Sequence, residues 1–130
     1  MLICREAAAE IDFCKAAFGA VELSRRADSD GSVVHATLEI GKLMIMVHNE
    51  SPHLASRAPQ PDGSSSVVIY LLVDDADSVI AQAVAAGARI LIPAANQFWG
   101  DRLGRIIDPA GHVWNIASRV GHGGDKNRDI

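Results

Sequence analysis

Polar side chains that can bind ligands or move protons alternate with aliphatic ones along two successive segments, 32–40 and 43–48. Residues two apart on a β-strand point to the same face, so each segment is predicted to be a strand with one mixed and one aliphatic face. The mixed faces carry His35, Thr37, Glu39, Met44, Met46 and His48. Because methionine adapts to varied ligand shapes and histidine titrates near neutral pH, this pattern predicts a small-molecule site.

The spacing of these side chains allows one chemical use and excludes another. His35, His48 and Glu39 together could chelate a divalent ion, although all three lie in one half of the chain. Direct proton transfer between His35 and Glu39 is excluded, because residues four apart on a strand are separated by about 13 Å. The other histidines are expected to make surface or turn hydrogen bonds; they are His53, His112 and His122.

Aromatic side chains are scarce, at 5% of the sequence, and three of them stand among the further candidates for ligand binding. These candidates are Tyr70, Asn115, Phe98, Trp99 and Arg102. The rings of Phe98 and Trp99 could stack on a planar ligand, and Arg102 could fork onto a carboxylate or phosphonate. In the structural alternative, Trp99 closes one end of a cavity while Asp101 and Arg102 form a local ion pair.

Several classes of function have no support in the sequence. No Gly-x-Ser-x-Gly motif occurs, and Cys4 and Cys14 lie at apolar positions without an adjacent histidine, which predicts buried, unreactive thiols in a reducing cytoplasm. A net charge of -4 without a basic stripe argues against nucleic-acid binding. No apolar stretch reaches the roughly 20 residues that a membrane span needs.

The periodicity of apolar residues predicts the elements that position these side chains. Helices are expected over 7–18 and 75–86, each followed by a glycine stop, Gly19 and Gly87. Trp114 is expected to pack against the second helix. Strands are predicted over 1–5, 21–27, 32–40, 43–48, 67–73, 89–92 (ended by Pro93), 103–107 and 112–118.

The two halves of the chain repeat. Gly19-Ala20 and Gly87-Ala88 follow the two predicted helices at a separation of 68 residues, and two strands joined by a tight turn follow each match. Each half therefore reads β-α-β-β-β, which predicts an α+β fold with a curved mixed sheet around a cavity. A single domain is expected over 1–120, with modules at about 1–50 and 66–120, a linker over 51–65 and a flexible tail over 121–130.

Three motifs carry a resemblance to a known superfamily. They are IDFCKAAFGA, VDDADSVIAQAVAAGA and QFWGDRLGRIIDPAGHVW. Together with the repeat they resemble the vicinal oxygen chelate superfamily of glyoxalases, bleomycin-resistance proteins and dioxygenases, in its PhnB-like branch, over residues 2–119. The first motif departs from the family in having Cys14 where tyrosine is usual. The resemblance implies outer helices, a sheet that curls around a ligand site, and a homodimer.

The same resemblance allows the metal ligands of the superfamily's enzymes to be carried over one by one. The first ligand would fall before Met1, and the other three map near Met46, near Val68 and at Asn115. Methionine, valine and asparagine make a poor set of donors for a hard or borderline divalent ion. We therefore expect no metal and no cofactor at this site.

These observations favour a cytoplasmic, homodimeric, metal-free protein that binds and sequesters a planar or anionic small molecule, with no nucleic-acid or membrane partner. A first alternative is a metal-dependent enzyme, a glyoxalase-like lyase or dioxygenase-type catalyst with non-standard ligands. A second is a dimeric interaction module with an occluded cavity.

Overall fold

The protein was analysed as a computed structural model, which describes residues 1–60 and 65–120. In the first half the elements are β1 (Leu2–Cys4), α1 (Ala7–Phe18), β2 (Val21–Ala27), β3 (Val33–Ile40) and β4 (Leu43–Asn49), followed by a short 3-10 helix (Pro52–Leu54). In the second half they are β5 (Val68–Leu72), α2 (Ala76–Ala85), β6 (Arg89–Asn96), β7 (Asp101–Ile107) and β8 (Val113–Arg119). The proposed tail, 121–130, and part of the linker lie outside the described residues.

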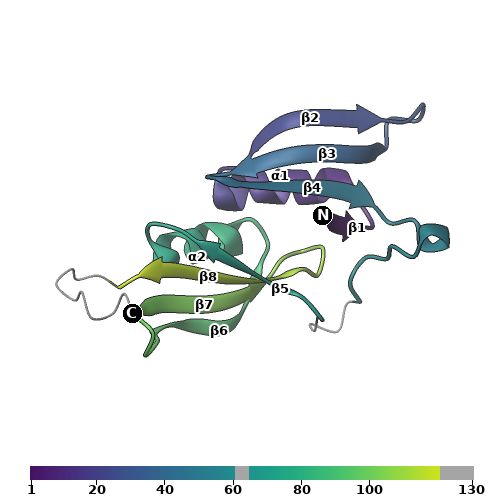
Figure 1. Cartoon of the computed structure of the whole chain (residues 1–130). Coiled ribbons are helices and arrows are strands. Elements are labelled where there is room, and N and C mark those ends of the chain that lie inside the picture. The colour runs from purple at the N-terminus through teal and green to yellow at the C-terminus, as the bar shows by residue number, and fades with distance from the viewer. Residues whose placement is uncertain (61–64, 121–130) are drawn as a thin grey trace.

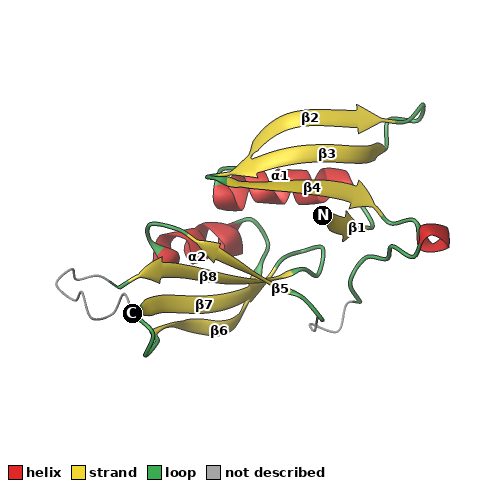
Figure 2. Ribbon diagram, viewed as in Figure 1, coloured by secondary structure: helices red, strands yellow, loops and turns green. Residues whose placement is uncertain are grey.

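The strands form two four-stranded sheets with the same topology (Figures 1 and 2). Their orders are β1-β4-β3-β2 and β5-β8-β7-β6, and in each sheet the first pair is parallel and the others antiparallel. The predicted α+β fold and the repeated βαβββ module are therefore confirmed. Each module contributes its own mixed sheet, and among the described strands no hydrogen-bonded pair joins the two.

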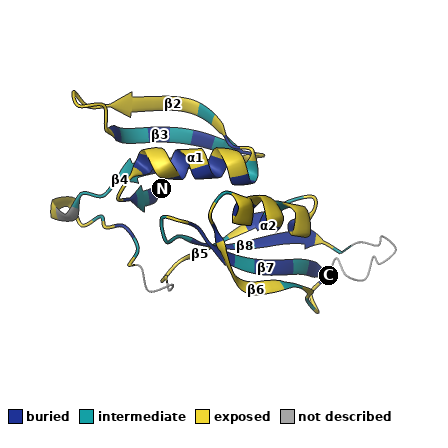
Figure 3. Ribbon diagram, turned by 180° about the vertical axis from the view of Figure 1, so that it is seen from behind, coloured by how far each residue is buried: buried dark blue, intermediate teal, exposed yellow. Residues whose placement is uncertain are grey.

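Both helices cover the same side of the molecule. The strands lie in front of α1 and α2 in Figure 1, whereas the view from behind in Figure 3 has the helices in front. The sheet faces beneath the helices carry the aliphatic residues of each strand, such as Leu38, Val47, Ile106 and Ile116, which are fully buried. We call the opposite, uncovered surfaces the open faces; both lie on the side away from the helices.

Contacts from outside the helices fix where they begin. The N-terminal residue of α1, Ala7, donates its backbone N–H to the side chain of Asn49 at 2.9 Å, so the end of β4 caps α1. Asp75 precedes α2 and accepts a hydrogen bond from the backbone of Ser78. These caps satisfy backbone donors that have no partner within a helix.

Strand β6 differs from the prediction, which ended it at Pro93. It continues to Asn96, with irregular pairing to β7 around the proline. Proline has no backbone N–H to donate to a neighbouring strand. It is tolerated here because β6 is an edge strand, which has a partner on one side only.

The two modules meet through buried side chains behind the sheets. Trp114 of β8 packs its ring against Phe18 of α1, with centroids 4.7 Å apart. Cys4 and Cys14 are free and buried, as predicted, and burial raises the pKa of both thiols, which leaves them protonated. No helix in the described part of the chain has the length and apolar character to cross a membrane.

Candidate ligand-binding site

The open face of the first sheet gathers all six residues that the alternation singled out. Thr37 lies opposite Met46, and Glu39 lies opposite Met44, in the pairing of β3 with β4. The neighbouring aliphatic residues lie on the buried face, as the twofold period of a strand requires. Met44 is 56% exposed, so the described chain leaves this face open to solvent.

His35 and His48 form a pair at the centre of this face. Nδ1 of His35 lies 2.6 Å from Nε2 of His48, so one nitrogen donates a proton that the other accepts. Thr37 Oγ1 lies 3.4 Å from the second nitrogen of His35. The pKa of His48 is lowered, first by burial and then by the charges of His35 and Arg26. Arg26 lies opposite His35 on β2.

The predicted chelate of His35, His48 and Glu39 is brought together only in part. No contact joins Glu39 to either imidazole, and in the described part of the chain no three His, Cys, Asp or Glu side chains gather as a metal site would require. The two histidines alone offer a pair of nitrogen donors.

The open face of the second sheet carries Tyr70, which lies opposite Asn115 in the pairing of β5 with β8. The Oδ1 atom of Asn115 accepts a hydrogen bond from Nε of Arg105 at 2.7 Å. Arg105 was missed from the sequence. Counting alternate positions of β7 finds it only once Gly104 is known to face α2, where a Cβ would lie 2.7 Å from Ile80, so that the neighbours of Gly104 face the other way.

A hydrogen-bonded chain fixes the tyrosine. The Tyr70 hydroxyl donates to Oδ2 of Asp101 at 2.5 Å and accepts from Nε1 of Trp99 at 3.3 Å. Asp101 is buried, and its other oxygen lies 3.6 Å from the guanidinium of Arg119. Burial, followed by the bond to Asp101, raises the pKa of Tyr70. Phe98 stands 97% exposed against the edge of the Trp99 ring, at the rim of this face.

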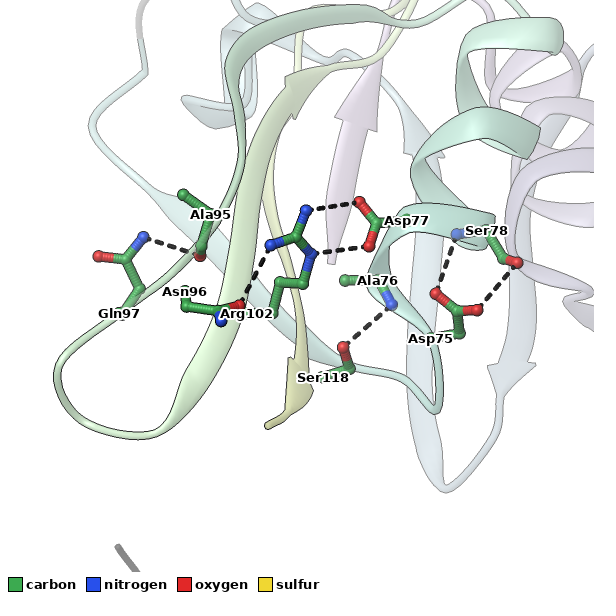
Figure 4. A network of polar contacts seen from close by, with 9 residues as sticks. All are labelled: Asp75, Ala76, Asp77, Ser78, Ala95, Asn96, Gln97, Arg102 and Ser118. Carbon is green, nitrogen blue, oxygen red and sulfur yellow. Dashed lines mark hydrogen bonds and ion pairs between the residues drawn. The ribbon is translucent and has the colours of Figure 1, made fainter. Parts of the chain in front are cut away.

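Arg102 lies on the opposite face from this cluster. Its Nε and Nη2 atoms fork onto Asp77 of α2 at 2.7 and 3.3 Å, and Nη1 bonds Asn96 (Figure 4). Successive residues of a strand point to opposite faces, so Asp101 and Arg102 diverge. The local ion pair between them, offered as the structural alternative, is therefore wrong: Arg102 ties β7 to α2 instead.

Two hollows lie where the modules meet. A groove of about 780 Å³ is lined by Tyr70 and Leu72 of β5, by Lys42 in the β3–β4 turn, and by Phe18 and Val79 of the helices. A second hollow of about 620 Å³ is lined in part by Ile45, Ile69 and His112. Tyr70 lines the larger groove and also lies on the open face of the second sheet.

The positions that correspond to the superfamily's metal ligands do not fit a divalent ion. Met46 and Val68 offer no hard donor. The amide oxygen of Asn115 is engaged by Arg105, whose positive charge opposes a cation beside it.

Comparison with known proteins agrees with this architecture. Residues 1–116 match the family model of the Glyoxalase/Bleomycin resistance protein/Dioxygenase superfamily. An uncharacterized protein of Mycobacterium tuberculosis is 38% identical over 122 residues, which are 92% of this chain and 72% of that protein. The crystal structure of TioX from Micromonospora sp. ML1 is similar with a TM-score of 0.71 and 25% identity, covering 91% of this chain and 94% of that one.

A more distant structure shares the fold. The fosfomycin resistance protein FosX from Listeria monocytogenes, solved with Mn(II) and a dihydroxypropylphosphonic acid, is 16% identical with a TM-score of 0.66, over 94% of this chain and 86% of that one. The repeated βαβββ modules, the two sheets with helices behind them and the match over residues 1–116 lead to one conclusion. The chain belongs to the Glyoxalase/Bleomycin resistance protein/Dioxygenase superfamily.

Proposed function

We propose that this protein is a metal-free binder of a small planar or anionic molecule, within the PhnB-like branch of its superfamily. The observation that carries the proposal is the pair of open faces. They present methionine, histidine, tyrosine and arginine side chains to solvent while the superfamily's ligand positions lack metal donors. Such a surface offers adaptable apolar area with a few fixed polar groups, as small-molecule sites do.

The proposed binder is a homodimer in which a second copy helps to enclose the ligand. Apolar side chains are exposed on two of the edge strands, Val21 and Leu23 on β2 and Ile90 and Ile92 on β6. Exposed apolar strands at the edge of a sheet are surfaces that proteins normally cover. The two buried free thiols, Cys4 and Cys14, support the proposed cytoplasmic location.

Mass and metal analysis of the purified chain test this function. Size-exclusion chromatography with light scattering is expected to give twice the 13.8 kDa of the chain. Native mass spectrometry and elemental analysis are expected to find no stoichiometric Ni, Zn, Fe or Mn. One such ion per chain, lost in His35→Ala and His48→Ala but kept in the matched control His53→Ala, would overturn the metal-free binder. A mass equal to that of one chain would contradict the proposed homodimer.

The second candidate is a metal-dependent enzyme, a glyoxalase-like lyase or dioxygenase-type catalyst with non-standard ligands. The close approach of the His35 and His48 nitrogens favours it, because an ion could take the place of the shared proton. The Mn(II) in FosX from Listeria monocytogenes illustrates metal use on this fold. The elemental analysis decides between the two candidates.

A further inference from the structure

Arg105 occupies the middle of the open face of the second sheet. On β7 it lies opposite Ile92 of β6 on one side and Asn115 of β8 on the other. Its side chain is half-buried, and Asn115 holds its Nε at 2.7 Å. Among the described residues, neither terminal nitrogen of Arg105 has a hydrogen-bond or ion-pair partner. The guanidinium is therefore oriented by an amide while its outer donors stay free.

Two other arginines of this sheet face carboxylates. Arg102 forks onto Asp77, and Arg119 lies near Asp101. Arg105 has only the neutral Asn115, so its charge is uncompensated within the described chain. A planar guanidinium with free donors matches a carboxylate in two parallel hydrogen bonds, and partial burial strengthens such a pair.

The surroundings of Arg105 indicate what the anion would be attached to. Asn115 of β8 lies between Arg105 of β7 and Tyr70 of β5, and all three lie on the same face. The backbones of Tyr70 and Arg105 are therefore two strand spacings, about 10 Å, apart. The Tyr70 ring is 44% exposed, and its hydroxyl is held by Asp101 and Trp99, which fixes the orientation of the ring. A flat apolar surface thus stands within one small molecule's length of a free guanidinium.

We propose that Arg105, oriented by Asn115, binds the carboxylate of an aromatic acid whose ring lies against Tyr70. The inference rests on the proposed small-molecule function and names the class of ligand. It assigns the anion contact to Arg105 and not to Arg102, whose fork is already occupied by Asp77 behind the sheet. Asn115 is a positioning residue, because it would act through Arg105.

Two matched probes test this assignment on the full chain: 2-naphthoate, and 2-naphthamide, which has the same rings without the charge. Isothermal titration calorimetry is expected to show the acid binding about tenfold or more tightly than the amide, since hydrogen bonds to a charged group account for such a difference. In Arg105→Gln the acid should weaken to the level of the amide, while binding of the amide stays unchanged. The preference for the acid should also fall with added salt.

Two further variants separate a local from a structural effect. Asn115→Asp keeps the arginine but places a carboxylate against it, so the preference for the acid should be lost. Arg25→Gln removes an arginine of the first sheet that pairs with Glu22, and should leave both probes unchanged. Circular dichroism checks that each variant is folded.

The outcomes distinguish this inference from the function beneath it. If wild-type protein binds both probes equally, or if Arg105→Gln weakens both alike, the assignment of Arg105 is overturned while small-molecule binding stands. If neither probe binds and native mass spectrometry finds no co-purified compound, both the assignment and the proposed function fail.

Discussion

His48, on the first open face, couples stability to pH. His35 and His48 share a hydrogen bond that needs one neutral acceptor, and Arg26 adds positive charge beside them. Burial and these neighbours lower the pKa of His48 below its ordinary value of 6.5. Below about pH 6.5 His48 is protonated in the unfolded chain but still neutral in the folded protein. The free energy of unfolding therefore falls as pH falls through this range.

We therefore predict that His48→Gln flattens part of the pH dependence. The urea midpoint of wild-type protein should drop between pH 7.5 and pH 5.5 by more than that of the variant. His53→Gln, which changes an exposed histidine of the 3-10 helix, serves as the control and should follow wild type. Equal drops for wild type and His48→Gln would contradict the assignment.

At the scale of single residues, strand parity predicted much of the site. Alternation placed His35, Thr37 and Glu39 on one face because a strand has a period of two. It did not find Arg105, since the boundary of β7 and the helix-facing role of Gly104 depend on contacts with α2. The partner of Arg102 also came from another element, and no local spacing indicates Asp77.

The packing of α2 on the second sheet depends on the absence of a side chain at Gly104. A Cβ there would lie 2.7 Å from Cδ1 of Ile80 and 3.1 Å from the backbone nitrogen of Ala94. The Ile80 methyl group can move, but the backbone of β6 has less freedom to do so. Gly104 therefore sets how closely α2 and β6 approach β7.

Gly104→Ala is predicted to destabilise the protein by about 1–3 kcal/mol, the usual cost of overpacking a core. Chemical denaturation measures the loss. Shortening the opposing side chain in Gly104→Ala/Ile80→Val should recover part of it, whereas Ile80→Val alone should lower stability. A double variant no more stable than Gly104→Ala would show that the clash with β6 dominates.

Helices and strands could be predicted from the sequence where the residues that determine them lie within the same segment. Helix α1 was predicted over 7–18 and found there, because its apolar period and Gly19 stop are contained in the segment. Its N-terminal cap was not predicted, since Asn49 comes from β4. Strand β6 passed Pro93 because an edge position tolerates proline, and strand order depends on the whole sheet.

At the scale of the whole molecule, the two modules are joined by a buried polar cluster as well as by apolar contact. His112, in the β7–β8 turn, lies with Nε2 2.9 Å from the carbonyl of Ile3 in β1. Asp108 of the same turn accepts from the indole of Trp114 at 2.9 Å and lies beside Glu10 of α1. The repeat predicted two modules. It could not predict these contacts between them, because the residues that make them are far apart in the sequence.

Glu10 makes this junction sensitive to pH in the opposite direction from His48. It is 1% exposed, and burial, followed by the neighbouring carboxylate of Asp108, raises its pKa well above 4.5. Folded Glu10 is therefore a neutral acid, whereas the unfolded chain loses this proton above about pH 4.5. The contribution of Glu10 to the free energy of unfolding is complete below about pH 4.5 and is lost as pH rises toward the pKa of Glu10 in the folded protein.

The isosteric change Glu10→Gln removes this titration while keeping the size and shape of the side chain. We predict that Glu10→Gln is more stable than wild type at pH 8 and that the difference shrinks toward pH 5, as measured by urea unfolding. Tryptophan fluorescence, which reports on Trp114 at the junction as well as on Trp99, and circular dichroism should give coincident transitions if the modules unfold together. Parallel stability profiles for wild type and variant would mean that folded Glu10 is ionised, and the junction would then have to supply a compensating charge beside it.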